Sequence, residues 1–185
     1  YEKRLSENEI MRNSIKKAIQ NGLPTVAECG GFLYLMQSLD GAEMAGVLPT
    51  SAHMTRRLQP FGYVMLTANS DNLLCEAGGQ FPVHEFHYAQ AVDNGTDFHA
   101  VKPNGRAWDC GFASDTLYAG FPHLYYYSNP AFAANFVKAC RNWEQETWQH
   151  GGRSMTLEET IHRIRPVDQK AKEDAKEHWD GLGKP

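Results

Sequence analysis

The sequence predicts an α/β fold with a mainly parallel sheet, because helical and strand patterns alternate over its first 40 residues. A helical pattern at 6–20 precedes a short apolar strand at 25–28 and a second helical pattern at 32–39. Residues 45–128 are richer in strand patterns than in helical ones. We therefore expect an antiparallel extension beside the parallel sheet, with helices packed on both of its faces.

Composition and charge describe an ordinary globular protein. The chain has 185 residues, 42% of them hydrophobic and 11% aromatic, and a net charge of −4. This length supports one domain with an appendage, and the charge does not predict nucleic-acid or acidic-membrane binding. No apolar run reaches membrane-spanning length. The four cysteines are far apart in the sequence, which favours a reducing cytoplasm over a disulfide framework.

The first helix has a start signal, an apolar face and a stop signal. Ser6 and Glu9 have the spacing of a capping box, with Ser6 as the N-cap. One face is apolar at helical spacing, through Met11, Ile15, Ala18 and Ile19. Asn21-Gly22 is typical of a helix end.

Three strands are predicted in the middle of the chain, at 61–67, 83–88 and 116–120. Asn94-Gly95 and Asn104-Gly105 are typical of turns between antiparallel strands. These patterns are the basis for the antiparallel extension.

Asn129-Pro130 opens a final helix, after which the composition changes. Its inner face is expected to carry Phe132, Phe136, Val137 and Cys140. Gly151-Gly152 forms a joint, so we assign residues 1–150 to the main domain and 151–185 to a linker and an appended helical segment. That segment is highly charged and has a narrow apolar stripe, which favours docking on a neighbour over burial in the main core.

Cys29 lies between the predicted strand at 25–28 and the helix that follows. Small residues stand two positions before and two after it, Ala27 and Gly31, which is the pattern of a nucleophile elbow. Amide groups at the helix start could stabilise a thiolate and an oxyanion. The competing interpretation is a buried structural cysteine.

A cysteine nucleophile needs a base, and eight histidines compete for that role. They are His53, His84, His87, His99, His123, His150, His162 and His178. His123 is best placed, because it follows the apolar strand at 116–120 and loops after strands carry catalytic groups in α/β sheets. For any one histidine, a structural or surface role is the alternative.

The stretch at 83–88 also invites a metal interpretation. In a strand His84 and His87 point to opposite faces, so they cannot chelate one ion together. Glu85 and His87 share a face, and we expect the carboxylate to orient an imidazole. No metal site is predicted.

These motifs together resemble the C-terminal glutamine amidotransferase domain of cobyrinic acid a,c-diamide synthases. The resemblance covers about residues 1–140 in the family's order. The matching residues are Leu5-Ser6-x-Asn8, Ala27-Glu28-Cys29-Gly30-Gly31-Phe32-Leu33-Tyr34-Leu35, Met44-Ala45-Gly46-Val47-Leu48-Pro49, Met54, Gly62-Tyr63, His84-Glu85-Phe86-His87-Tyr88 and His123-Leu124-Tyr125-Tyr126.

The resemblance implies a three-layer, flavodoxin-like fold of the class I amidotransferase type and a glutaminase site. Cys29 would attack the glutamine carboxamide, His123 would transfer protons, and the Gly30 N–H would stabilise the oxyanion. Gly31 and His87 would contact the substrate. This group lacks the triad Glu that more distant amidotransferases have at the position of Tyr125, so Glu85 is expected to act as the orienting carboxylate.

The family has further strands before the position of Tyr1, and a P-loop-type synthetase domain before those strands. This chain has no G-x-x-x-x-G-K-[ST]. The resemblance therefore implies a fragment with no cofactor of its own. ATP and Mg²⁺ would act in the synthetase domain of the parent, where the ammonia would amidate cobyrinic or hydrogenobyrinic acid in cobalamin biosynthesis.

The tail carries a second resemblance, over about 30 residues. Thr156 to Asp168, with Ile164-x-Pro166-Val167-Asp168, and then Gly183-Lys184-Pro185 are similar to the start of nicotinate-nucleotide–dimethylbenzimidazole phosphoribosyltransferases. This implies a fusion of two cobalamin-pathway enzymes. An ordinary charged, solvated helix is the alternative. The tail could also pair with another copy, so a homodimer stays open.

The sequence also leaves three alternative functions open. Two are sibling enzymes, a cobyric acid synthase and a nickel-tetrapyrrole a,c-diamide synthase. The third is a non-catalytic amidotransferase-like module for docking or sensing, against which the presence of both Cys29 and His123 argues.

Overall fold

The computed structural model describes residues 2–59 and 61–149. The chain divides into two compact units, 1–143 and 144–185. The described helices are α1 (Glu2–Glu7), α2 (Glu9–Gln20), α3 (Gly30–Leu35) and α4 (Ala131–Gln149). The predicted joint at Gly151-Gly152 and the predicted helical tail lie outside the described residues.

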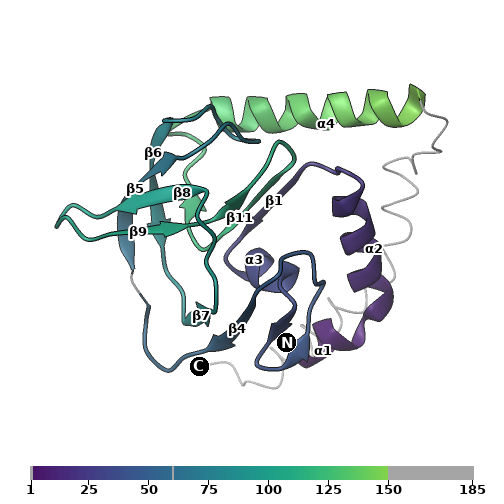
Figure 1. The fold of residues 1–185 in the computed structure, drawn as a ribbon, viewed down its shortest axis with the longest axis horizontal. Coiled ribbons are helices and arrows are strands. Elements are labelled where there is room, and N and C mark those ends of the chain that lie inside the picture. Colours follow the sequence, from purple (N-terminus) through teal and green to yellow (C-terminus); the bar gives the residue numbers. More distant parts are fainter. Residues whose placement is uncertain (1, 60, 150–185) are drawn as a thin grey trace, which may run out of the picture. The chain divides into compact units, whose positions relative to one another are not determined.

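A three-stranded sheet holds the strand that leads to Cys29. In it β1 (Thr25–Glu28) pairs in parallel with β11 (Leu117–Gly120), and β11 pairs antiparallel with β10 (Phe112–Ala113). Figure 1 shows β1 and β11 side by side, with α3 following β1. Glu28 is opposite Gly120 in the register, so both parallel strands end at the same edge. The segments after both strands therefore start close together.

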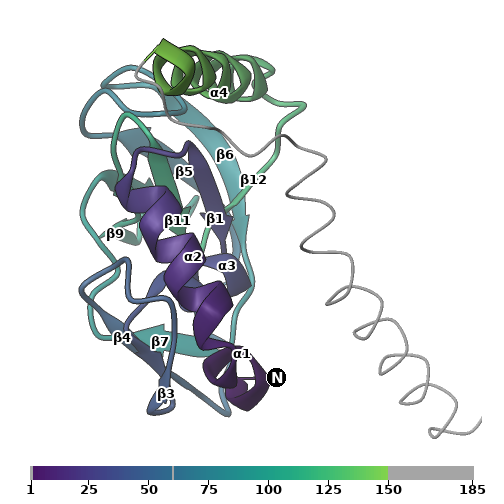
Figure 2. The same cartoon turned by 90° about the vertical axis from the view of Figure 1, so that its right-hand side faces the viewer.

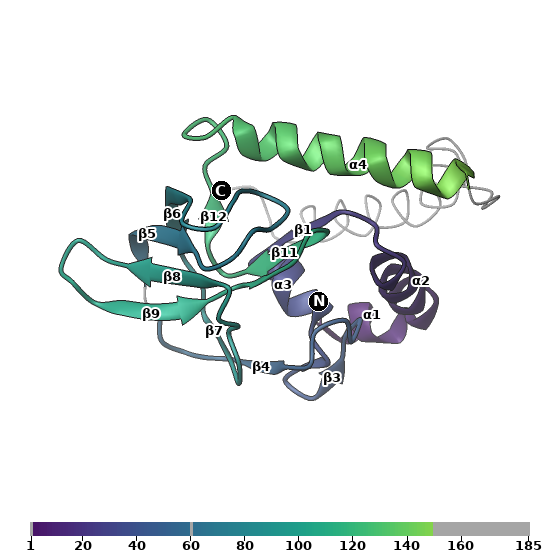
Figure 3. The same cartoon turned by 45° about the horizontal axis from the view of Figure 1, so that its top comes forward.

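The largest sheet is antiparallel throughout. Its order is β12 (His123–Leu124), β6 (Gln80–Glu85), β5 (Gly62–Ala68), β8 (Phe98–Val101) and β9 (Ala107–Cys110). Figure 3 shows β12 beside β6 and the long β8–β9 hairpin. The predicted Asn104-Gly105 turn is confirmed, because it joins β8 to β9 and Gly105 has a φ of 82°. This sheet anchors the segment that carries His123.

A third, smaller sheet has the order β3 (Ala42–Glu43), β2 (Ser38–Leu39), β4 (Ser51–Met54) and β7 (Ala89–Ala91). Here only β2 and β4 are parallel. The mixed α/β class is confirmed, but within the described residues antiparallel pairs outnumber the two parallel ones, unlike the mainly parallel sheet that we expected. Four of the antiparallel pairs, β2–β3, β5–β6, β8–β9 and β10–β11, join strands that are consecutive in sequence. A parallel pair instead needs a crossover connection.

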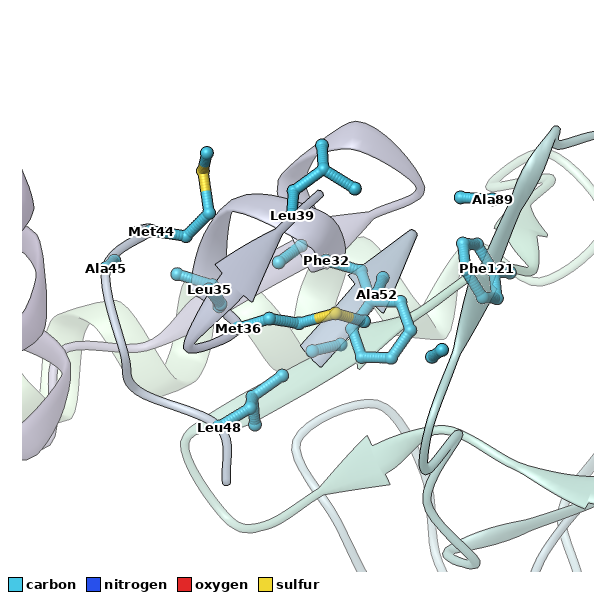
Figure 4. Packing of buried hydrophobic residues seen from close by; sticks show 13 residues of the cluster. Phe32, Leu35, Met36, Leu39, Met44, Ala45, Leu48, Ala52, Ala89 and Phe121 are labelled. Carbon is cyan, nitrogen blue, oxygen red and sulfur yellow. The ribbon is translucent and has the colours of Figure 1, made fainter. Parts of the chain in front are cut away.

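Two hydrophobic cores hold the sheets and helices together. The first surrounds α3, where Phe32 is fully buried and meets Phe121 edge-on with ring centroids 5.0 Å apart (Figure 4). The second lies in the five-stranded sheet, where Phe132 of α4 packs edge-on against Phe81 with centroids 4.4 Å apart. Phe132 was predicted for the inner face of α4. Val137 was wrongly predicted there, because 46% of its surface is exposed.

The N-terminal helix differs from the prediction in its start. The pattern at 6–20 is broken at Asn8, so Ser6 lies inside α1 and does not cap α2. The Asn8 side chain accepts a hydrogen bond from the Met11 N–H at 3.1 Å and is the N-cap of α2. Figure 2 shows α2 beside the sheet of β1 and β11, and its apolar face packs on the first core through Ile15 and Ile19.

The capping assignment is testable by mutation. Asn8→Ala should destabilise the fold by about 1 kcal/mol, because the Met11 N–H loses its acceptor. The thermal midpoint should fall by roughly 2–4 °C in a chain of this size. Ser6→Ala is the matched control and should leave the midpoint unchanged in the same thermal scan. An equal loss in both variants would contradict the assignment of Asn8 as the cap.

Candidate active site

Cys29 occupies a sharp turn between β1 and α3, as the sequence predicts. Its φ is 49° and its ψ is −101°, a conformation that non-glycine residues rarely adopt. Two backbone hydrogen bonds fix it: its N–H donates to the Gly120 carbonyl at 2.8 Å, and its carbonyl accepts from Leu33 at 3.0 Å. The turn is therefore held by both the neighbouring parallel strand and the following helix.

The two glycines after Cys29 have different surroundings: Gly30 borders open space, whereas Gly31 is packed closely against β1. A Cβ built on Gly30 would meet no atom within 4 Å, whereas one on Gly31 would lie 3.5 Å from the Cβ of Ala27. A side chain larger than alanine at Gly31 would have to avoid strand β1. The small residues thus allow the close strand–helix packing that the pattern predicts.

The Cys29 thiol is half-buried, and its surroundings favour the protonated form. Burial raises the pKa of Cys29 above its ordinary value, and the charge of Glu28 raises this pKa further. The backbone N–H of Gly30 acts in the opposite direction and lowers it. Since the resting thiol is protonated at neutral pH, it needs a base before it can attack.

His123 lies at the same edge of the fold as Cys29. Cys29 directly follows β1, and His123 comes three residues after the last residue of β11, the parallel partner of β1. In β12, His123 is opposite His84 of β6. The sheet pairing thereby brings together two segments that are almost one hundred residues apart in sequence.

The His123 ring is oriented by a backbone carbonyl. Its Nδ1 is 3.0 Å from the carbonyl oxygen of His84, which can only accept a hydrogen bond. In neutral His123, Nδ1 therefore carries the proton and Nε2 is left with a free lone pair. A carbonyl thus occupies the place that a carboxylate has in a three-residue catalytic triad.

Glu85 does not orient the His123 ring, contrary to the expectation from the sequence. Its side chain makes no hydrogen bond to a described residue, and the Nδ1 partner of His123 is the His84 carbonyl rather than this carboxylate. Only 3% of Glu85 is exposed, and it lines a cavity of about 250 Å³ with Arg106, Trp108 and Cys110. Burial raises the pKa of Glu85 to about 7, although the charges of Lys102 and Arg106 lower it.

His87 lines the same cavity, so Glu85 and His87 do face a common space. Its ring is stacked on Phe121 with centroids 3.7 Å apart, and its Nδ1 donates to the Ala89 carbonyl at 2.8 Å. Burial lowers the pKa of His87; the hydrogen bond to Ala89 raises it, and the nearby His123 lowers it. His87 is therefore a neighbour of the His123 segment, with its own ring held in place.

The structure adds two residues that sequence reasoning missed, Glu28 and Tyr126. The Oε1 atom of Glu28 accepts from the Tyr126 hydroxyl at 3.2 Å and from the Leu124 N–H at 3.3 Å. The available signal was a carboxylate at the end of a buried strand, next to the candidate nucleophile. The contacts themselves depend on long-range pairing that the sequence pattern does not reveal.

Neither a metal-binding cluster nor a membrane-spanning helix is found among the described residues. They hold no group of three or more His, Cys, Asp or Glu side chains that could bind a metal ion. None of the helices within residues 2–59 and 61–149 is both long and apolar enough to cross a membrane.

Comparisons with known proteins identify the family of this chain. The model of the CobB/CobQ-like glutamine amidotransferase domain matches residues 1–131. The cobyrinate a,c-diamide synthase of Methanothermobacter thermautotrophicus is 41% identical over 145 residues, or 76% of this chain and 32% of that protein. The corresponding enzyme of Caldanaerobacter subterraneus is 34% identical over 77% of this chain and 33% of its own length.

A third relative is named for hydrogenobyrinate instead of cobyrinate. The hydrogenobyrinate a,c-diamide synthase of Streptomyces coelicolor is 37% identical over 76% of this chain and 29% of that protein. The chain thus spans about a third of the length of the curated relatives that it matches. It belongs to the family of CobB/CobQ-like glutamine amidotransferase domains.

Proposed function

We propose that this chain is the glutaminase part of an amidoligase that converts cobyrinic or hydrogenobyrinic acid to its a,c-diamide. The observation that carries the proposal is the strained turn at Cys29, beside the segment that bears His123. The names of the relatives supply the substrate class. The four cysteines are all free, which supports the expectation of a reducing cytoplasm.

In the proposed reaction Nε2 of His123 takes the proton of the Cys29 thiol, and the sulfur attacks the carboxamide carbon of glutamine. The Gly30 N–H would donate to the oxyanion of the tetrahedral intermediate. His123 then returns the proton to the leaving nitrogen, and ammonia departs. Water, activated by the same imidazole, hydrolyses the glutamyl thioester to glutamate and restores the thiol.

Two further residues have proposed contacts with the substrate. Gly31 and His87 flank the turn and the His123 segment, and we assign them to glutamine binding. Glutamine is the expected substrate of this part of the protein, because the family is one of glutamine amidotransferases.

The amidation step needs an activated carboxylate, and we assign it to the remaining two thirds of the relatives' length. The described residues offer no ligand cluster for Mg²⁺, and the sequence has no P-loop signature for ATP. We therefore propose that ATP and Mg²⁺ act in that remaining part of the protein. The proposed phosphoribosyltransferase fusion and the homodimer concern the tail, and they stay predictions.

Covalent labelling tests the proposal. Diazo-oxo-norleucine is a glutamine analogue with an electrophilic carbon, and it should alkylate Cys29 in the complete polypeptide that carries these residues. Peptide mapping by mass spectrometry should find one label, and excess glutamine should protect against it. The Cys29→Ser variant should take up no label and should not hydrolyse glutamine.

The other cysteines serve as internal controls. Cys110 is buried, and burial together with the charge of Glu85 raises its pKa to about 12, so it should stay unlabelled. Cys75 and Cys140 are only half-buried and report on nonspecific alkylation. Labelling of one of these with Cys29 left free would overturn the assignment of the nucleophile. A protein that takes no label and releases no ammonia would instead be the non-catalytic docking or sensing module.

A further inference from the structure

Glu28 connects the two halves of the proposed catalytic pair. It is the last residue of β1 and directly precedes Cys29, while one of its oxygens accepts from the Leu124 N–H at 3.3 Å and from the Tyr126 hydroxyl at 3.2 Å. Leu124 directly follows His123. A single carboxylate therefore joins the turn of the nucleophile to the segment of the base.

The segment that carries His123 is fixed at other points as well. The Pro122 carbonyl accepts from the hydroxyl of the fully buried Tyr118 at 3.0 Å. The His123 ring donates to the His84 carbonyl. These bonds hold the segment to β11 and β6, but neither reaches the chain next to Cys29. The two bonds to Glu28 make that direct connection.

The position of Glu28 has an electrostatic cost for the proposed reaction. Its negative charge raises the pKa of the neighbouring Cys29, and a nucleophile works better as a thiolate. Burial, together with the same charge, raises the pKa of Tyr126 to about 12, so this hydroxyl keeps its proton and can donate. A carboxylate that opposes thiolate formation at this place calls for a compensating role, and the two hydrogen bonds provide one.

We propose that Glu28 is a positioning residue that holds the His123 segment against the Cys29 turn, with Tyr126 as its side-chain partner. This inference rests on the proposed function, in which Cys29 and His123 act together. Displacing a catalytic group by about 1 Å can cost on the order of 100-fold in rate. Loss of this connection should therefore lower kcat much more than it changes KM.

Two substitutions at Glu28 separate the hydrogen bonds from the charge. Glu28→Gln keeps an acceptor oxygen for Leu124 and Tyr126 and removes the charge, whereas Glu28→Ala removes both. We expect Glu28→Ala to lower the kcat of glutamine hydrolysis by at least about tenfold, within the range for a displaced catalytic group. Glu28→Gln should recover most of that loss.

The pKa of the Cys29 thiol is a second readout, which reports the effect of the Glu28 charge. The rate of Cys29 alkylation by iodoacetamide, measured as a function of pH, reports the thiol pKa. Both Glu28 variants should lower this pKa, because Glu28 is the one charged side chain among the described residues that acts on it. A role confined to folding would not move the thiol pKa in both variants while separating their kcat values.

Tyr126 gives an independent test that does not disturb the strand. Tyr126→Phe removes one of the two bonds to Glu28 and should lower kcat several-fold with little change in KM. Tyr127→Phe is the matched control, because this neighbour is 87% exposed and makes no hydrogen bond to the described residues that involves its hydroxyl. It should leave kcat unchanged.

The outcomes distinguish a failure of the proposed function from a failure of the positioning role of Glu28. If Cys29→Ala still hydrolyses glutamine, the proposed function itself fails. If Cys29→Ala is inactive but folded Glu28→Ala and Tyr126→Phe both keep the unaltered kcat, only the positioning role is overturned. If Glu28→Ala does not fold, as judged by its thermal midpoint, Tyr126→Phe decides, because it removes one hydroxyl from a partly exposed ring.

Discussion

Replacing His123 with asparagine is expected to lower the rate of glutamine hydrolysis by about 10²–10⁴-fold, the usual contribution of a general base. The Cys29 thiol is protonated at neutral pH, since burial and the charge of Glu28 both raise its pKa. Asparagine keeps a donor for the His84 carbonyl but has no group that can accept the thiol proton. The measurement is ammonia release at saturating glutamine, with thermal midpoints to verify folding.

Two other histidines make this prediction specific. His87→Asn should reduce activity less, because the Nδ1 of His87 is bonded to the Ala89 carbonyl and its ring is stacked on Phe121. His99→Asn should have no effect, since His99 pairs with Asp109 on the exposed face of the β8–β9 hairpin. If His87→Asn abolished hydrolysis while His123→Asn retained it, the assignment of the base would be wrong.

The local part of the fold was predictable because its signals are local. The strand at 25–28 has the predicted bounds, and the turn at Cys29 follows from the small residues around it. The next helix was predicted at 32–39 but is Gly30–Leu35. It starts earlier because Cys29 is its N-cap, and it ends earlier because Met36 is fully buried in an extended conformation, from which the chain enters β2.

In the strand-rich middle of the chain, the sequence pattern predicts strand bounds and strand pairing less accurately. The strand predicted at 83–88 is Gln80–Glu85, because its bounds are set by pairing with β5 rather than by its own residues. Asn94-Gly95 was wrongly predicted as a turn between paired strands: it lies in the irregular connection from β7 to β8, which belong to different sheets, and only the Gly95 φ of 77° agrees with the signal. A turn signal gives the local conformation and does not identify the strands that pair.

The candidate site likewise has one part that the local sequence predicts and one part that long-range contacts determine. Cys29 and His123 were predicted from their places after strands, which is a property of the sequence near each residue, and their catalytic roles stay predictions. The partner of His123 is a backbone carbonyl, and any residue at position 84 would supply it. No side-chain pattern can predict such a bond. The carboxylate expected for that role, Glu85, is instead buried beside a cavity.

The burial of Glu85 predicts an unusual dependence of stability on pH. Its ordinary pKa of 4.5 is raised to about 7 in the folded protein, so between these values the folded state binds more protons than the unfolded state. The stabilisation from the protonated carboxyl is complete below pH 4.5 and is lost as the pH rises through about 7. The loss is on the order of 3 kcal/mol, since each pKa unit corresponds to about 1.4 kcal/mol.

Glu85→Gln should remove this dependence, because the amide resembles the neutral acid and cannot ionise. At pH 8 we expect the variant to be more stable than the unaltered protein by up to about 3 kcal/mol, which is roughly 6–12 °C in the thermal midpoint. At pH 4.5 the two should unfold at similar temperatures. Glu76→Gln makes the same charge change at an exposed position and should reproduce neither result. Parallel stability curves for Glu85→Gln and the unaltered protein from pH 4.5 to 8 would mean that Glu85 is ionised at neutral pH, with its charge balanced by Lys102 and Arg106.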